Sequence, residues 1–219
     1  MQIKGLKINF LGDSITEGHG TSSLEHTFWN LLASRDGAVT RGYGIGGTRI
    51  SRQQSVSPKP VYDEFFRSRV AGMDPDADVV FVFGGTNDYG HGDAAIGHFT
   101  DRTDDTFYGA LHNLCTDLIA RYPKAMIVFL TPTHRLNENR VYNEWGVRCV
   151  GSLRDYVNCI REVTEYYSIP VIDLYRESGI QPELPELREQ FMPDGLHPND
   201  AGHERIYSMI KDFLERTNR

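Results

Sequence analysis

The chain has 219 residues, of which 39% are hydrophobic and 24% are charged, and this is the length and composition of one globular domain spanning residues 1–219. Its formal net charge of −7 argues against a nucleic-acid partner and a polybasic membrane-binding surface, because both depend on an excess of Lys and Arg. No apolar run approaches the ~20 residues of a membrane span, and the N-terminus lacks the apolar core of a signal peptide, so we expect a cytoplasmic protein.

Short apolar runs along the chain have the length and composition of buried strands. In chain order they span residues 8–11, 39–41, 79–83, 126–130 and 170–174. The run 79–83 is the clearest, since it is continuous, β-branched and aromatic, as expected for a strand covered on both faces. The run 39–41 is the weakest.

Between these runs, apolar residues recur at helical spacing. Phe107, Leu111, Leu114 and Leu118 predict an amphipathic helix that ends before Pro123. The same pattern predicts helices over 150–160 and 201–213, and a shorter one within 62–70. Alternation of strands and helices predicts an α/β fold with three α/β/α layers and a five-stranded, mostly parallel, flavodoxin-like sheet.

One irregular stretch, residues 176–193, contains three prolines and leads directly to Asp194 and His197. In open α/β sheets, ligands bind beyond the carboxyl ends of the strands. The polar segments of interest either follow a predicted strand or lie at the end of this stretch. We therefore expect them to meet at one edge of the sheet.

A serine, a carboxylate and an imidazole stand in positions that suggest nucleophilic catalysis. Ser14 follows the first predicted strand, and Asp194 and His197 are three residues apart near the C-terminus. A serine hydroxyl is a poor nucleophile until a base takes its proton, and the base works best when a third group orients it. These residues predict a serine hydrolase.

Four blocks extend this pattern. They are Gly-Asp-Ser at 12–14, Gly-Ile-Gly-Gly-Thr at 44–48, Gly-Gly-Thr-Asn-Asp at 84–88 and Asp-Gly-Leu-His at 194–197. In order and spacing they resemble the GDSL-like, or SGNH, hydrolase family, which is named for a catalytic Ser, an oxyanion-hole Gly and Asn, and a catalytic His. The resemblance runs from residue 8 to about residue 215 and implies the SGNH hydrolase fold.

The resemblance also implies a role for individual residues. Ser14 would be the nucleophile, with its backbone N–H as one oxyanion donor. Gly47 would supply a second backbone N–H and Asn87 a side-chain amide. His197 would be the general base and Asp194 its orienting partner. Taken alone, Ser14 is equally typical of a helix cap, Gly47 of a plain turn and Asn87 of an Asx turn.

The second block departs from the family pattern. Gly42 stands where an asparagine is frequent, which leaves the anchoring of loop 44–48 open. Gly46 precedes Gly47, so the donor could lie one residue earlier. Asp13 is expected to organise the loop around Ser14 and not to take part in the chemistry.

The sequence predicts no metal site and no cofactor. The histidines outside the last block form no HExxH or comparable ligand set, and the three cysteines form no CxxC or paired framework, so they are expected to be small buried hydrophobes. After the fourth strand, His134, Arg135 and Trp145 could line the substrate pocket or could form a solvated loop with one packed indole.

We therefore expect an esterase that acylates Ser14 and then hydrolyses the acyl-enzyme of a small-molecule ester. A short acyl group is favoured, with an acetylated carbohydrate among the candidates, because the stretch 176–193 is too charged to line a long acyl chain, although Leu184, Leu187 and Phe191 could form one wall. The alternatives are a lysophospholipase or thioesterase acting on longer chains, acyl transfer to a sugar, and a flavodoxin-like binding module in which loop 44–47 holds a phosphate.

Overall fold

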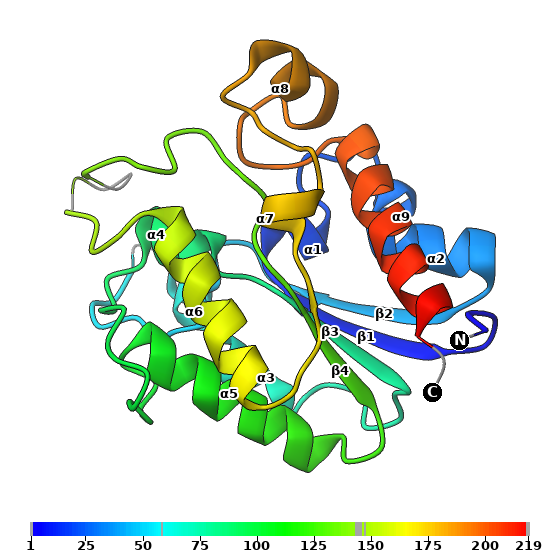
Figure 1. The fold of residues 1–219 in the computed structure, drawn as a ribbon, viewed down its shortest axis with the longest axis horizontal. Coiled ribbons are helices and arrows are strands. Elements are labelled where there is room, and N and C mark those ends of the chain that lie inside the picture. The colour runs from blue at the N-terminus through cyan, green and yellow to red at the C-terminus, as the bar shows by residue number, and fades with distance from the viewer. Residues whose placement is uncertain (1, 58, 143–145, 147, 218–219) are drawn as a thin grey trace.

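The computed structural model of the protein describes residues 2–57, 59–142, 146 and 148–217. Within these residues the strands form one parallel five-stranded sheet in the order β2-β1-β3-β4-β5, with helices on both faces (Figure 1). The strands are β1 (Lys7–Gly12), β2 (Val39–Gly44), β3 (Val79–Phe83), β4 (Met126–Leu130) and β5 (Val171–Ile172). The predicted three-layer α/β/α architecture is confirmed.

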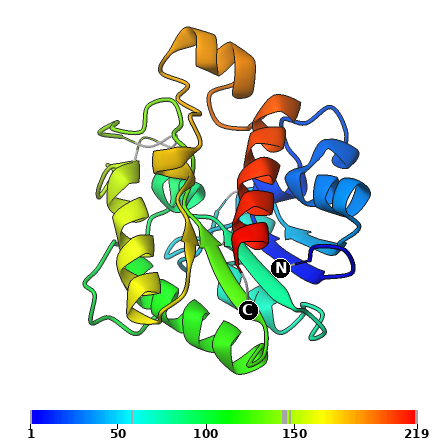
Figure 2. The ribbon, with the colours of Figure 1, turned by 45° about the vertical axis from the view of Figure 1, so that its right-hand side comes forward.

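Strand β3 is buried along its whole length because helices cover both of its faces. Val80 and Val82 belong to the apolar cluster on one face, whereas Val79, Phe81 and Phe83 belong to the cluster on the other. Figure 2 shows the helices as layers on either side of the sheet. The first layer contains α3 (Phe66–Val70), α5 (Phe107–Arg121) and α6 (Leu153–Tyr166), and the second contains α2 (Phe28–Asp36) and α9 (Asp200–Arg216).

Short elements gather at the carboxyl edge of the sheet, because parallel strands end on the same side. They are α1 (Ser14–Glu17), η1 (Leu24–His26), η2 (Pro60–Asp63), α4 (Thr86–His91), α7 (Leu174–Glu177) and α8 (Pro185–Phe191). Helix α8 projects beyond the other layers at the top of Figure 1. Strand order reverses at β1, which pairs with β2 on one side and β3 on the other, and such a reversal opens a crevice for ligands.

The segments near the C-terminus differ from the sequence prediction. The fifth strand, expected over 170–174, is confined to β5, because the side chain of Asp173 accepts the N–H of Arg176 at 3.2 Å and thereby caps α7. The stretch 176–193, expected to be irregular, contains α8, which begins with Pro185, a residue tolerated in the first turn of a helix.

The remaining helices follow the prediction in part. Helices α5 and α9 lie where the helical periodicity places them. Helix α6, expected over 150–160, begins only at Leu153, and Val150 is exposed before it. The segment 62–70, expected to be one short helix, forms η2 and α3, with extended backbone at Phe65 between them. The apolar pattern did not predict α2, because its buried residues Phe28, Leu31 and Leu32 span barely one turn.

Two cysteines are buried as expected. Burial raises the pKa of the Cys115 thiol to about 12 and that of Cys159 to about 11, so neither is a reactive thiolate at neutral pH. Cys149 is partly exposed. In the part of the chain that the structure describes, no helix is long and apolar enough to cross a membrane.

A buried imidazole joins α9 to α2. His203 is fully buried, its Nδ1 accepts the backbone N–H of Phe28 at 3.2 Å, and its ring stacks on that of Phe28 with the centroids 5.5 Å apart. Since Nδ1 is an acceptor, the ring is neutral. Burial lowers the pKa of His203 to about 4. Because α9 begins just after the fourth block, this contact helps to fix where His197 lies.

We predict that His203 makes the fold less stable in mild acid. The unfolded chain protonates this residue below about pH 6.5, whereas the folded chain resists protonation until about pH 4. The free energy of unfolding should therefore fall by about 2–3 kcal/mol from this residue as the pH drops from 7 to 4.5.

Urea denaturation of the wild type and of His203→Gln at both pH values measures this contribution. The Gln amide oxygen can still accept the Phe28 N–H but does not titrate, so the variant should lose less stability between the two pH values. Other titrating groups contribute equally to both proteins. Equal losses would contradict the prediction.

Candidate active site

Ser14 lies where β1 ends and α1 begins. Gly12 permits this sharp turn, since a Cβ atom there would lie 1.9 Å from Oγ1 of Thr16. Asp13 caps α1 by accepting the N–H of Ile15 at 3.0 Å, and burial raises its pKa to about 6 despite that hydrogen bond. Asp13 thus organises the loop, as expected. Ser14 is the first residue of α1, and no acceptor among the described residues bonds its N–H.

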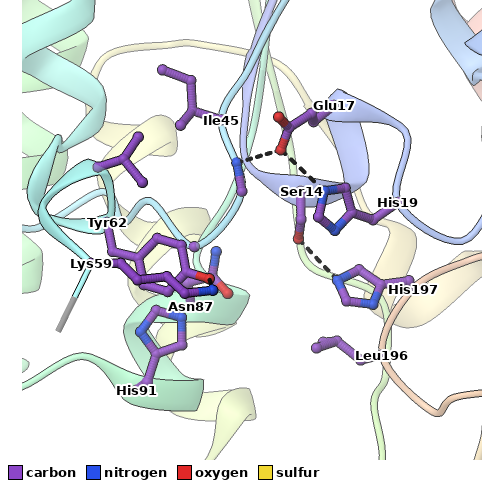
Figure 3. Close-up of a pocket in the computed structure, with 13 residues that line it drawn as sticks. Ser14, Glu17, His19, Ile45, Lys59, Tyr62, Asn87, His91, Leu196 and His197 are labelled. Carbon is purple, nitrogen blue, oxygen red and sulfur yellow. Dashed lines mark hydrogen bonds and ion pairs between the residues drawn. The ribbon is translucent and has the colours of Figure 1, made fainter. Parts of the chain in front are cut away.

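The predicted catalytic residues meet in one chain of hydrogen bonds. Ser14 Oγ lies 3.1 Å from Nε2 of His197 (Figure 3). Nδ1 of His197 lies 2.7 Å from Oδ2 of Asp194. The other oxygen of Asp194 accepts the backbone N–H groups of Leu196 at 2.8 Å and of His197 at 2.7 Å. The block 194–197 therefore holds its own carboxylate and imidazole together.

The charge on Asp194 determines which nitrogen of His197 faces the serine. Burial would raise the pKa of Asp194, but the hydrogen bonds from the His197 ring and from two backbone N–H groups lower it to about 2. An ionised carboxylate only accepts hydrogen bonds, so Nδ1 of His197 carries the proton. Nε2 is then free to accept the proton of the Ser14 hydroxyl, which is the geometry that general-base activation of a serine requires.

Gly47 and Asn87 line the same cavity as Ser14 and His197. Gly47 is the third residue of a turn in which the N–H of Thr48 bonds the carbonyl of Ile45 at 3.3 Å. Its φ of +78° is in the left-handed region that favours glycine. Asn87, in the first turn of α4, donates from Nδ2 to the Thr48 carbonyl at 2.9 Å. One amide hydrogen of Asn87 therefore fixes its side chain to the turn, and the other remains available to a ligand.

The buried Asp88 and the partly buried Arg69 anchor the loop after β2. Asp88 accepts hydrogen bonds from the N–H of Ile50 at 3.0 Å and from the N–H and hydroxyl of Ser51 at 2.8 and 2.6 Å, and burial raises its pKa. Arg69 donates to the carbonyls of Tyr43 and Gly12 and to the Thr48 hydroxyl at 2.8–3.0 Å, and burial lowers its pKa to about 10. The Arg69 guanidinium thus joins the carboxyl ends of β1 and β2.

The departure from the family pattern at Gly42 has a structural explanation. A Cβ atom at Gly42 would lie 2.7 Å from the indole of Trp29, so this ring occupies the space of a side chain. The Trp29 indole N–H donates to the carbonyl of Thr16 on α1 at 2.9 Å. Trp29, Asp88 and Arg69 therefore secure this region without an asparagine at position 42.

A cavity of about 610 Å³ opens above Ser14. Four of the predicted residues line it, and Asp194 lies behind His197. The other lining residues include polar side chains that the sequence analysis did not single out. The lining consists of Ser14, Glu17, His19, Ile45, Gly46, Gly47, Lys59, Val61, Tyr62, Asn87, His91, Leu196 and His197. Glu17 and His19 are close to Ser14 in the sequence, and this closeness could have indicated that they line the cavity. No sequence pattern places Lys59 or Tyr62 there.

His134 and Arg135, which follow β4, are not among the residues that line this cavity. Nδ1 of His134 lies 2.9 Å from the carboxylate of Glu138, and its ring packs against Tyr175. Arg135 is buried, with its guanidinium donating to the carbonyl of Thr86 at 3.1 Å. Trp145 lies outside the described residues.

We predict that Gly47→Ala damages both the turn and the activity. A left-handed backbone costs alanine about 1–2 kcal/mol, and the new Cβ would lie 2.4 Å from the Tyr62 ring. We expect a thermal midpoint lower by a few degrees and a value of kcat/KM at least tenfold lower, measured by calorimetry and ester hydrolysis.

Gly5→Ala is the matched control, since Gly5 has a φ of +82° and open space around it. This variant should lose stability through the backbone alone and keep its activity. If Gly47→Ala retained the wild-type kcat/KM, Gly47 would not hold an essential donor.

The sequence and fold match known proteins over nearly the whole chain. Residues 10–205 match the model of the GDSL-like Lipase/Acylhydrolase family. A GDSL lipase of Mycobacterium tuberculosis is 24% identical over 222 residues, which cover 93% of this chain and 79% of the lipase. A solved structure of a Lactobacillus plantarum protein is 30% identical with a TM-score of 0.83, covering 99% of this chain and 100% of that one.

An acetyl xylan esterase shares the fold at 21% identity, with a TM-score of 0.66 over 95% of this chain and 100% of the esterase. The family match extends over the strand ends that carry Ser14, Gly47 and Asn87, and over the block that carries Asp194 and His197. The chain belongs to the GDSL-like lipase/acylhydrolase family, and it is a carboxylic ester hydrolase.

Proposed function

We propose that the protein is a serine esterase in which Ser14 is the nucleophile, His197 the general base and Asp194 the residue that orients the base. The continuous contact from Ser14 Oγ through His197 to Asp194 is the observation that carries this proposal. The Ser14 and Gly47 N–H groups and the Asn87 amide form the oxyanion hole. Donors placed where negative charge develops commonly contribute the largest single stabilisation of such a transition state.

In the first half of the reaction, Ser14 Oγ attacks the ester carbonyl while Nε2 of His197 takes the hydroxyl proton. The carbonyl oxygen becomes an anion, which the oxyanion hole stabilises. When the intermediate collapses, the bond to the alcohol breaks, and His197 returns the proton to the departing oxygen. Asp194 keeps its negative charge throughout and stabilises the imidazolium that forms between these steps.

In the second half, water replaces the alcohol. His197 takes a proton from this water, the resulting hydroxide attacks the acyl-enzyme, and the same donors stabilise the second anion. Collapse of this intermediate releases the carboxylic acid and returns the proton to Ser14.

The substrate we propose carries a short acyl group, with an acetylated carbohydrate as the leading class. The cavity lining places carboxylate, imidazole, ammonium and phenol groups beside Ser14, and such groups suit the hydroxyls of a carbohydrate; its aliphatic side chains are those of Ile45, Val61 and Leu196. The apolar residues of the 176–193 stretch do not provide that surface: Leu187 packs on a separate cluster of Ile180, Phe191 and Met192, and Leu184 is exposed. The shared fold of an acetyl xylan esterase agrees with this class.

We predict that Ser14→Ala abolishes turnover and leaves the fold intact. Removing the nucleophile of a coupled triad costs on the order of 10⁴–10⁶ in kcat. Ester hydrolysis, labelling by a fluorophosphonate probe and circular dichroism test this together. More than a tenth of the wild-type activity, or labelling at another residue, would refute the assignment.

We predict that activity declines as the acyl chain grows. A series of p-nitrophenyl esters from acetate to octanoate, compared by kcat/KM, measures this preference. Each CH₂ buried in an apolar groove contributes about 0.8 kcal/mol, and we expect no such gain beside the carboxylate, imidazole, ammonium and phenol groups of the cavity. An octanoate value tenfold above the acetate would instead favour a lysophospholipase or thioesterase.

A further inference from the structure

The direction of the Gly47 N–H depends on the conformation of one turn. Residues 45–48 form a four-residue turn in which Gly47, at the third position, has a φ of +78°. Gly46, at the second position, is not in the left-handed region, so the turn is of type II. Rotation of the peptide between Gly46 and Gly47 would convert it to type I, with a φ near −90° at the third position, and would point the Gly47 N–H to the opposite side.

One side chain from the nucleophile helix reaches this turn. Glu17 lies one helical turn after Ser14 on α1, and its Oε2 accepts the N–H of Gly46 at 2.6 Å (Figure 3). The same oxygen lies 3.2 Å from Nε2 of His19. A hydrogen bond to a carboxylate is about twice as strong as one between neutral groups. Glu17 therefore connects the helix that carries the Ser14 N–H to the turn that carries the Gly47 N–H.

The turn is held from its other side by an aromatic ring. The Tyr62 ring occupies the space where a Cβ atom of Gly47 would lie, with the nearest ring carbon 2.4 Å from that position. In Figure 3, Glu17 and Tyr62 lie on opposite sides of the 45–47 segment. The anchors Arg69 and Asp88 act at Thr48, Ile50 and Ser51, outside the peptide that bears the donor.

We propose that Glu17 is a positioning residue for the oxyanion hole. By fixing the Gly46 N–H, it holds the Ile45–Gly46 peptide against α1. This sets the position from which the next peptide directs the Gly47 N–H to the developing anion at Ser14. This inference rests on the proposed function, because it concerns the transition state formed at Ser14. A displacement of about 1 Å at such a site can cost ~10²-fold in rate.

Glu17→Ala and Glu17→Gln distinguish a positioning role from an effect of the charge and from direct contact with the substrate. Alanine removes the acceptor, so we expect kcat to fall roughly 10- to 100-fold with little change in KM. Glutamine keeps a carbonyl oxygen for the Gly46 N–H but loses the charge, so it should retain kcat within about threefold of the wild type. Glu25→Ala removes an exposed carboxylate outside the cavity and should leave kcat and KM unchanged.

Several outcomes would overturn the proposal. Equal losses in Glu17→Ala and Glu17→Gln would mean that the charge matters and the acceptor does not. A change confined to KM would make Glu17 a substrate contact. An unchanged kcat in Glu17→Ala would show that Glu17 does not position the oxyanion hole. Circular dichroism and thermal midpoints establish that each variant is folded, as expected for a side chain that is 44% exposed.

The rate of labelling by a fluorophosphonate gives a second measurement that does not depend on the natural ester. The phosphoryl oxygen needs the same donors, so Glu17→Ala should be labelled at least tenfold more slowly and Glu17→Gln at nearly the wild-type rate. If the wild type reacted at Ser14 and Glu17→Ala reacted equally fast, this inference alone would fail. If the wild type did not react at Ser14, the proposed function would fail first.

Discussion

The pairing of β1 with β2 on one side and with β3 on the other is the constraint on which the site depends. Gly12 aligns with Gly44 and with Phe83 in the parallel register, so the segments beyond these residues leave the sheet side by side. Ser14, Gly47 and Asn87 belong to those segments. Their closeness follows from strand order and register, whereas their orientation requires further contacts made by side chains.

Those contacts are made by charged groups that folding has removed from water. Burial shifts the pKa values of Asp13, Asp88 and Arg69 in the direction that favours their neutral forms. Such groups are tolerated because their polar atoms bond backbone groups of the loops. Each bond restricts a segment that has no regular structure of its own. The loops that carry Ser14, Gly47 and Asn87 are therefore held by side-chain hydrogen bonds in place of regular structure.

The sequence predicts the sheet and the reactive groups because both depend on local pattern. The run 79–83 is apolar throughout since both faces are covered, and Ser14 and Asn87 stand directly after strands. Asp194 and His197 are close in sequence, so their contact needs no long-range information. Tyr62 and Arg69 lie outside any motif, and what they touch depends on how η2 and α3 pack. Strand β5 is shorter than its apolar run because one carboxylate, that of Asp173, caps α7.

The pair formed by Ser14 and His197 spans 183 positions of the chain. One partner leaves the first strand and the other precedes the last helix, so the site bridges the two ends of the fold. During synthesis the serine is made before its base, and the two can meet only after the segment that carries His197 has been made and has packed against the sheet. Loop closure over such a distance carries an entropic cost that the intervening sheet must first offset. Hydrolytic activity therefore requires that both segments are folded and packed, whereas a single strand can be buried before that point.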